Sequence, residues 1–124
     1  MLGSKAKSET TVTATDTAKA VGSGTLEVFA TPMMVALMEN AAIKALQLTE
    51  EQTSVGTYLD VKHIAATPIG MKAWAEAEII EVDGRRIVYK IEAFDEKEKI
   101  GEGRHERFIV ISDKFITKAN SKHD

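Results

Sequence analysis

The stretch that decides the fold is TPMMVALMENAAIKAL, residues 31–46. It predicts a helix, because the Thr31 hydroxyl can cap the first turn and Pro32 suits the first helical position. The residues that follow are apolar on almost every face, which is typical of a helix buried by the rest of the fold. The sequence therefore predicts one long buried helix around which the domain is organised.

Glu39 is a charged residue within the apolar part of this helix. Its neighbours three and four positions away are all apolar, namely Val35, Ala36, Ala42 and Ile43. A carboxylate in such surroundings loses hydration, which costs free energy unless a partner compensates. Glu39 is therefore a candidate functional residue, and the alternative is a structural ion pair with a buried arginine or lysine.

The composition limits the classes of function. The 124 residues fit a single domain, and a net charge of -3 with a pI near 5.6 argues against a nucleic-acid partner. The absence of cysteine excludes disulfides, thiolate zinc sites and a cysteine nucleophile. There is no apolar run of membrane-spanning length and no signal-peptide core, so we expect a cytoplasmic protein without a membrane partner.

The segments around the helix have the pattern of β-strands. We expect a first strand at 10–14, and after the helix strands at 55–65, 71–82, 85–94 and 100–111, with a hairpin at Asp83-Gly84. In the strand at 55–65, the set expected to face the helix is Val55, Thr57, Leu59, Val61, His63 and Ala65. The predicted class is α+β, an antiparallel sheet wrapped around one buried helix. The domain is expected at 10–116, between a flexible tail at 1–9 and a C-terminal tail at 117–124.

Glu39 and His63 are the most informative pair of candidate catalytic residues. Both are expected to face the helix–sheet interface, where they could meet in one cleft within a chain or across a dimer. A carboxylate and an imidazole can together perform acid–base catalysis near neutral pH. Thr31 is the third candidate, because a helix N-terminus can stabilise a carbonyl oxygen. The structural alternatives are a core histidine for His63 and helix capping for Thr31.

The last predicted strand carries His105-Glu106-Arg107. We interpret His105 and Glu106 as part of a strand with mixed surface charges. Arg107 has two possible roles, binding an anionic group or positioning Glu39. The three histidines are scattered, with His123 in the C-terminal tail, so no metal site is expected, and no phosphate loop or dinucleotide motif indicates a cofactor.

Four segments resemble the fluoroacetyl-CoA thioesterase-like branch of the hotdog superfamily. They are FATPMMVALME at 29–39, VKHIAATP at 61–68, DGRR at 83–86 and GEGRHER at 101–107. The resemblance covers about Val12 to Ile111. It implies a hotdog fold, a homodimer and hydrolysis of acyl-CoA thioesters, with coenzyme A present only as part of the substrate.

The same resemblance assigns roles to individual residues. The catalytic threonine, glutamate and histidine of the family fall on Thr31, Glu39 and His63, and its active-site arginine falls on Arg107. Phe29 and Pro32, in the helix motif, are further candidate substrate-binding residues. Selective members carry phenylalanines in the lid segment before the helix, whereas this chain has GSGTL at 22–26. That departure favours a broader or different acyl group.

The sequence thus predicts an acyl-CoA thioesterase in which Glu39 is the nucleophile or the general base. One alternative is a hotdog enoyl-CoA hydratase, whose usual Asp-x-Asn-Pro-x-His pattern is absent from this chain. The other is an acyl-CoA-binding protein that has the pocket but no turnover.

Overall fold

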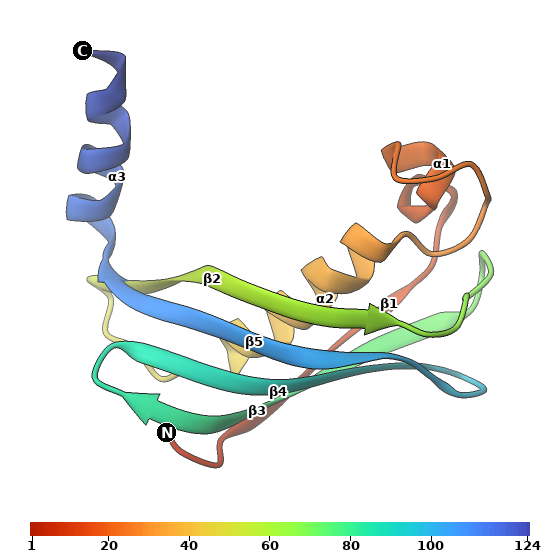
Figure 1. The fold of residues 1–124 in the computed structure, drawn as a ribbon, viewed down its shortest axis with the longest axis horizontal. Helices are drawn as coiled ribbons and strands as arrows, with labels where there is room; N and C mark the ends of the chain where they lie inside the picture. Colours follow the sequence, from red (N-terminus) through yellow and green to blue (C-terminus); the bar gives the residue numbers. More distant parts are fainter.

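A curved antiparallel sheet holds one long helix in the computed structural model, which describes residues 1–124 (Figure 1). The strands are β1 (Lys5–Thr11), β2 (Gln52–His63), β3 (Lys72–Asp83), β4 (Arg86–Asp95) and β5 (Lys99–Ile111). The helices are α1 (Ala18–Val21), α2 (Thr31–Lys44) and α3 (Ser112–Asn120), with 3-10 turns η1 (Ala14–Asp16) and η2 (Ser121–His123).

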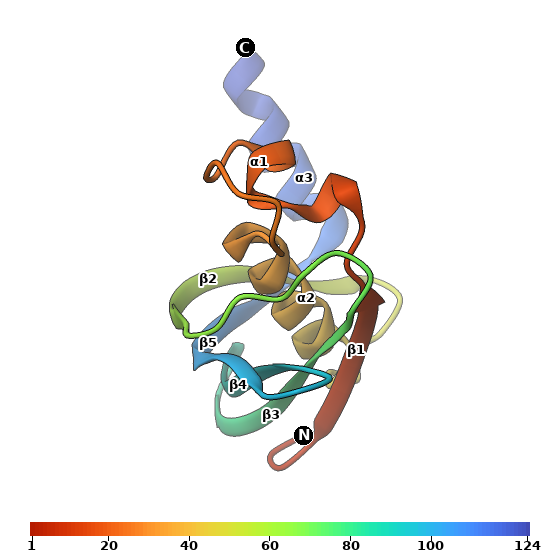
Figure 2. The same ribbon diagram turned by 90° about the vertical axis from the view of Figure 1, so that its right-hand side faces the viewer.

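The five strands lie in the order β1-β3-β4-β5-β2, and every neighbouring pair is antiparallel. Figure 2 shows α2 lying in the hollow of the curved sheet. This arrangement confirms the predicted α+β class, and the hairpin expected at Asp83-Gly84 joins β3 to β4. None of the helices combines the length and hydrophobicity that crossing a membrane requires.

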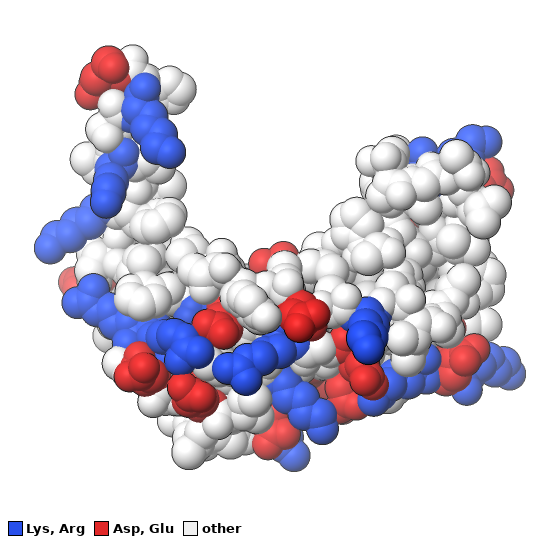
Figure 3. All heavy atoms as spheres, viewed as in Figure 1, with Lys and Arg blue, Asp and Glu red and all other residues white.

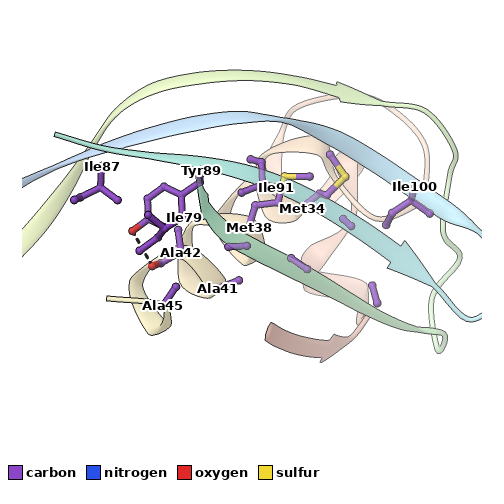
Figure 4. Close-up of a cluster of buried hydrophobic side chains, with 14 of the residues drawn as sticks. Met34, Met38, Ala41, Ala42, Ala45, Ile79, Ile87, Tyr89, Ile91 and Ile100 are labelled. Atoms are coloured by element: carbon purple, nitrogen blue, oxygen red, sulfur yellow. Dashed lines mark hydrogen bonds between the residues drawn. The ribbon is translucent and has the colours of Figure 1, made fainter. Parts of the chain in front are cut away.

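The core lies between one side of α2 and the concave face of the sheet (Figure 4). The helix contributes Met34, Met38, Ala41 and Ala42, followed by its C-cap residue Ala45, and these side chains face Ile79, Ile87, Tyr89 and Ile91 of the central strands. The alanines of β3 leave room for the helix to approach the sheet, and Tyr89 places its ring beneath the last turn. The Tyr89 hydroxyl donates a hydrogen bond of 3.0 Å to the Ala42 carbonyl, which gives this buried polar group a partner.

The opposite side of α2 is not covered within one chain. Ala36 is exposed, Val35 is half-buried and 49% of Ile43 is accessible to solvent. The sheet of a single chain therefore covers only one side of this apolar helix. The exposed apolar stripe is a surface that an additional partner could cover.

Both expected tails contain regular structure. Residues 5–9, predicted to be flexible, belong to β1 and pair with β3, so the first strand begins at Lys5 and not at residue 10. In this segment the exposed residues Lys5, Lys7 and Glu9 alternate with inward-facing residues. Its composition is that of a solvated tail, but the alternation is that of an edge strand with a charged outer face. At the other end, α3 extends beyond β5 and projects away from the sheet (Figure 1).

A β-bulge in β2 changes which side chains face the helix. The register against β5 shifts between Gly56 and Tyr58, so an extra residue enters the strand there. Beyond the bulge, Val61 and Ala65 pack against the core as predicted, whereas Leu59 is 41% exposed. Before it, the alternation is reversed, and Ser54 rather than Val55 is buried.

Candidate active site

Thr31 and His63 form the first half of the candidate site. The Thr31 hydroxyl lies 2.7 Å from Nδ1 of His63, which is the last residue of β2. The predicted capping role of Thr31 is not observed, because Ala30 is the N-cap residue and Thr31 already belongs to the helix. Its hydroxyl is therefore directed to the imidazole and not to the backbone of the first turn.

The other ring nitrogen of His63, Nε2, is buried and has no hydrogen-bond partner. Burial lowers the pKa of His63 below 6.5, and a backbone interaction with Ala65 opposes this only in part. The ring is consequently neutral at neutral pH, so it can accept or donate a proton according to its tautomer.

A groove of about 330 Å³ opens beside this pair. It is lined by Ala18, Ser23, Val28, Phe29, Thr31, His63, Ile64, Ala65 and Ala66. The lining is mostly apolar with a few polar groups, which is the usual character of a small-molecule site. Three of these residues, Ser23, Val28 and Phe29, belong to the segment between α1 and α2, where the family resemblance places a lid.

Glu39 and Arg107 form the second half of the candidate site. Nη1 of Arg107 lies 3.5 Å from Oε2 of Glu39, so the carboxylate is paired with the arginine. The Arg107 side chain is only 6% exposed, whereas that of Glu39 is 34% exposed. The arginine is thus anchored inside the protein, and the carboxylate beside it is reachable from solvent.

Ser54 holds Arg107 in place. Nε of Arg107 donates to Oγ of Ser54 at 2.8 Å, and Nη2 donates to the Ser54 carbonyl at 2.9 Å. Ser54 thus accepts two hydrogen bonds from the planar guanidinium group, and this fixes the direction of the group. Of the two roles considered for Arg107, this geometry favours the positioning of Glu39.

Gly56 allows the carboxylate to approach the sheet. A Cβ atom at this position would lie 2.7 Å from Oε2 of Glu39 and 3.3 Å from Nη1 of Arg107. Any side chain at Gly56 would therefore displace the Glu39–Arg107 pair. Glycine in a strand interior often marks such a close approach or a bulge, and both occur here.

His105 lies behind Arg107 and is fully buried. Its Nδ1 lies 2.8 Å from the Tyr58 carbonyl and its Nε2 lies 3.3 Å from Nη1 of Arg107. The ring stacks on Tyr89 with the centroids 5.6 Å apart. The interpretation of His105 as part of a charged surface strand is therefore wrong, because the curved sheet buries this face of β5.

The two halves do not meet within one chain. Glu39 contacts Arg107, and His63 contacts Thr31. Glu39 follows Thr31 by eight positions along α2, which corresponds to a rise of about 12 Å along the helix. At that separation, Glu39 and His63 of the same chain cannot exchange a proton directly.

The remaining candidates occupy different places. Phe29 is 2% exposed and lines the groove, whereas Pro32 is exposed and does not belong to the lining. No cluster of three or more histidine, aspartate or glutamate side chains is arranged to hold a metal ion. Sequence reasoning missed Ser54 and Gly56, although a glycine inside a predicted strand was a signal for the bulge.

Comparisons with known proteins place this chain in a family. A family model described as "Fluoroacetyl-CoA-specific thioesterase" matches residues 12–113. A fluoroacetyl-CoA thioesterase from Streptantibioticus cattleyicolor is 42% identical over 98 residues, which cover 77% of this chain and 70% of that protein.

Solved structures agree with this match. A mutant of the fluoroacetyl-CoA-specific thioesterase, in complex with fluoroacetate and CoA, superposes with a TM-score of 0.87 at 34% identity, covering 93% of this chain and 98% of that one. A Thermus thermophilus protein described as a thioesterase superfamily member superposes with a TM-score of 0.90 at 30% identity, covering 99% and 93% of the two chains. The predicted hotdog architecture is thus confirmed, and the chain belongs to the fluoroacetyl-CoA-specific thioesterase family.

Proposed function

We propose that this protein is an acyl-CoA thioesterase that hydrolyses small acyl thioesters. The observation that carries the proposal is the Thr31–His63 pair, whose buried Nε2 lacks a partner and which lines an apolar groove. The relatives named for fluoroacetyl-CoA hydrolysis support the same reaction class. A neutral imidazole held by a hydroxyl at a helix N-terminus suits a site in which an acyl carbonyl is activated.

In the proposed reaction, the thioester carbonyl oxygen is stabilised at the N-terminus of α2, close to the Thr31 hydroxyl. Glu39 acts either as general base on a water molecule or as the nucleophile that forms an anhydride, which water then hydrolyses. The carbon–sulfur bond breaks as the tetrahedral intermediate collapses. His63 supplies a proton to the departing thiolate or orients the attacking water, so that the products are the carboxylic acid and free coenzyme A.

We further propose that the active unit is a homodimer in which Glu39 of one copy completes the Thr31–His63 half of the other. The two halves are too far apart in one chain for direct proton transfer, as the contacts of Glu39 and His63 indicate. The uncovered stripe of α2 around Glu39 includes Val35 and Ile43, which a second copy would shield from water. Figure 3 shows a hollow between α3 and the α1 region whose surface is mostly uncharged, and a second copy could occupy it.

The acyl group is proposed to be small, with a broader range than fluoroacetyl alone. The groove is lined by the short side chains Ala18, Ala65 and Ala66, together with Val28 and Phe29. The segment at 22–28 carries no aromatic residue that would close over the acyl group. Because coenzyme A thioesters are intracellular metabolites, we also propose a cytoplasmic location.

A panel of acyl-CoA substrates tests this proposal. Release of free coenzyme A is followed with a thiol-reactive dye, using acetyl-, fluoroacetyl-, propionyl-, butyryl- and crotonyl-CoA. The thioesterase releases thiol from the short saturated substrates. A hydratase would reduce the enoyl absorbance of crotonyl-CoA without releasing thiol, and a binding protein would do neither. Either of the latter two results would overturn the proposal.

A further inference from the structure

His105 is a buried titratable residue that the proposed reaction does not use. It is fully buried between β2, β4 and α2, and each of its ring nitrogens has one partner. The Tyr58 carbonyl can only accept a hydrogen bond, so Nδ1 must carry a proton. The Arg107 guanidinium can only donate, so Nε2 must offer a lone pair. The contacts thus require a neutral ring with the proton on Nδ1.

The surroundings favour this protonation state. Burial lowers the pKa of His105, and the Arg107 cation acts in the same direction. The opposing influences are the Tyr58 carbonyl of β2 and the carboxylates of Glu39 on α2 and Glu106 on β5. From β4, Tyr89 stacks on the ring, and burial raises the pKa of its hydroxyl to about 12, so it stays uncharged.

We propose that His105 is a positioning residue that acts as a neutral hydrogen-bond acceptor for Arg107 and thereby holds the arginine against Glu39. Nη1 of Arg107 is shared between the two, at 3.3 Å from Nε2 of His105 and 3.5 Å from Oε2 of Glu39. His105 also ties this arginine to the β2 bulge, because its Nδ1 is bonded to the carbonyl of Tyr58 just after Gly56. The inference rests on the proposed function through the role given to Glu39.

Protonation of His105 would disrupt this arrangement. A second N–H group would then face Nη1 of Arg107, and two cations would lie within 3.3 Å of each other inside the protein. The guanidinium group would have to turn away, and Glu39 would lose the partner that orients it. His105 is therefore expected to contribute to the loss of kcat at acidic pH.

The tautomer can be measured directly by NMR on the wild-type protein. Long-range proton–nitrogen correlations on ¹⁵N-histidine-labelled protein distinguish the two neutral tautomers and the charged ring. We expect His105 to be neutral with its proton on Nδ1 at neutral pH. A ring protonated on Nε2, or a charged ring, would overturn the inference. The NMR measurement does not depend on turnover. The inference about His105 can therefore be overturned while the thioesterase proposal stands, and the thioesterase proposal can be overturned while His105 has the expected tautomer.

Two substitutions separate positioning from packing. His105→Gln can place its amide oxygen near the position of Nε2, where it accepts from Arg107. His105→Asn can place its amide nitrogen near the position of Nδ1 and donate to the Tyr58 carbonyl, but its side chain is one methylene shorter, so its oxygen does not reach the position of Nε2. We expect kcat of the glutamine variant within about 3-fold of wild type, and a fall of about 10-fold or more for asparagine, because misplacing a catalytic group is costly. The acidic limb of the kcat profile should also move to lower pH in the glutamine variant.

A merely structural role for His105 predicts a different outcome. The two variants would then lose activity together, in proportion to their loss of thermal stability, and the pH profile would be unchanged. That result would overturn the inference, as would an asparagine variant with wild-type kcat. If neither variant folds, the tautomer measurement decides alone.

Discussion

The hydroxyl of Thr31 and Nδ1 of His63 lie 2.7 Å apart, which joins the first residue of α2 to the last residue of β2. Thr31 is exposed and does not cap the helix by its side chain, so this contact contributes little to the stability of the helix. Its main consequence is to fix the orientation of the imidazole at the edge of the groove. A helix N-terminus and a neutral histidine are thereby held side by side.

Replacing Thr31 tests this relationship. Thr31→Ala removes the partner of Nδ1, so we expect kcat for a short acyl-CoA to fall by about 10- to 100-fold. Thr31→Ser retains the hydroxyl and should keep most of the activity. Because the residue is exposed, Tm should change little in both variants. Equal kcat values for alanine and serine would contradict an active role for the hydroxyl.

His105, which is fully buried, and His63, which is partly buried, should make stability depend on pH. Burial lowers the pKa of His63 and of His105 in the folded chain, while both return to 6.5 on unfolding. As pH falls below 6.5, the unfolded chain binds more protons, so the free energy of unfolding decreases. Well above pH 6.5 both histidines are neutral in the folded and in the unfolded chain, so they no longer make the free energy of unfolding depend on pH.

Urea unfolding at about pH 7.5 and about pH 5.5 measures this dependence. Between the higher and the lower pH, the wild-type protein should lose more stability than the His63→Gln variant, because glutamine does not titrate. The carboxylates of Glu92 and Glu106, whose pKa values are lowered by Lys99 and Arg86 respectively, titrate at more acidic pH and affect both proteins alike. An identical loss in wild type and variant would show that His63 is not buried in neutral form.

Two glycines of the β2–β5 pair should respond differently to the same substitution. In Gly56→Ala the new Cβ comes closest to the flexible end of Glu39, at 2.7 Å, which can move aside at small cost in stability. It also lies 3.3 Å from Arg107 and from His105, which need to shift by only a few tenths of an ångström. In Gly103→Ala the Cβ meets the backbone of Asp60 and Val61, which cannot. We therefore expect Gly56→Ala to lose activity by about 10-fold or more with a nearly unchanged Tm, since Glu39 is displaced. Gly103→Ala should instead lower Tm.

The opposite pattern would contradict the site. A Gly56→Ala protein with wild-type kcat would mean that the position of Glu39 does not matter for turnover. The measurements are initial rates of thiol release and thermal unfolding of both variants under the same conditions.

Mixed dimers test whether the site is shared between copies. Glu39→Gln and His63→Ala are each expected to be inactive as homodimers. In a mixed dimer, one of the two sites combines an intact Glu39 with an intact His63. After unfolding and refolding together in equal amounts, about half of the dimers are mixed, so about one quarter of the wild-type activity should return. A mixture no more active than its components would place the complete site within one chain.

Much of the fold could be predicted because its signals are local. The Asp83-Gly84 turn and the strand expected at 85–94 are properties of short segments, and the structure confirms both. The first strand was expected to begin at residue 10, and the part of β1 before it was missed because its lysines and glutamate resemble a solvated tail. Only pairing with β3, which is distant in sequence, makes these residues a strand.

The candidate site was predicted less completely because its geometry depends on contacts between distant segments. Thr31, Glu39 and His63 could be proposed from their own neighbours. The burial of His105 and the role of Ser54 could not, because they follow from the β2 bulge and from the curvature of the sheet.

Turnover by Glu39→Gln is the most direct test of the proposed function. Glutamine has nearly the shape of glutamate but can act neither as nucleophile nor as base, and Ser54 still holds Arg107 in this variant. We predict that thiol release from the best acyl-CoA substrate falls by about 100-fold or more while Tm stays close to that of wild type. Undiminished thiol release by Glu39→Gln would contradict the account.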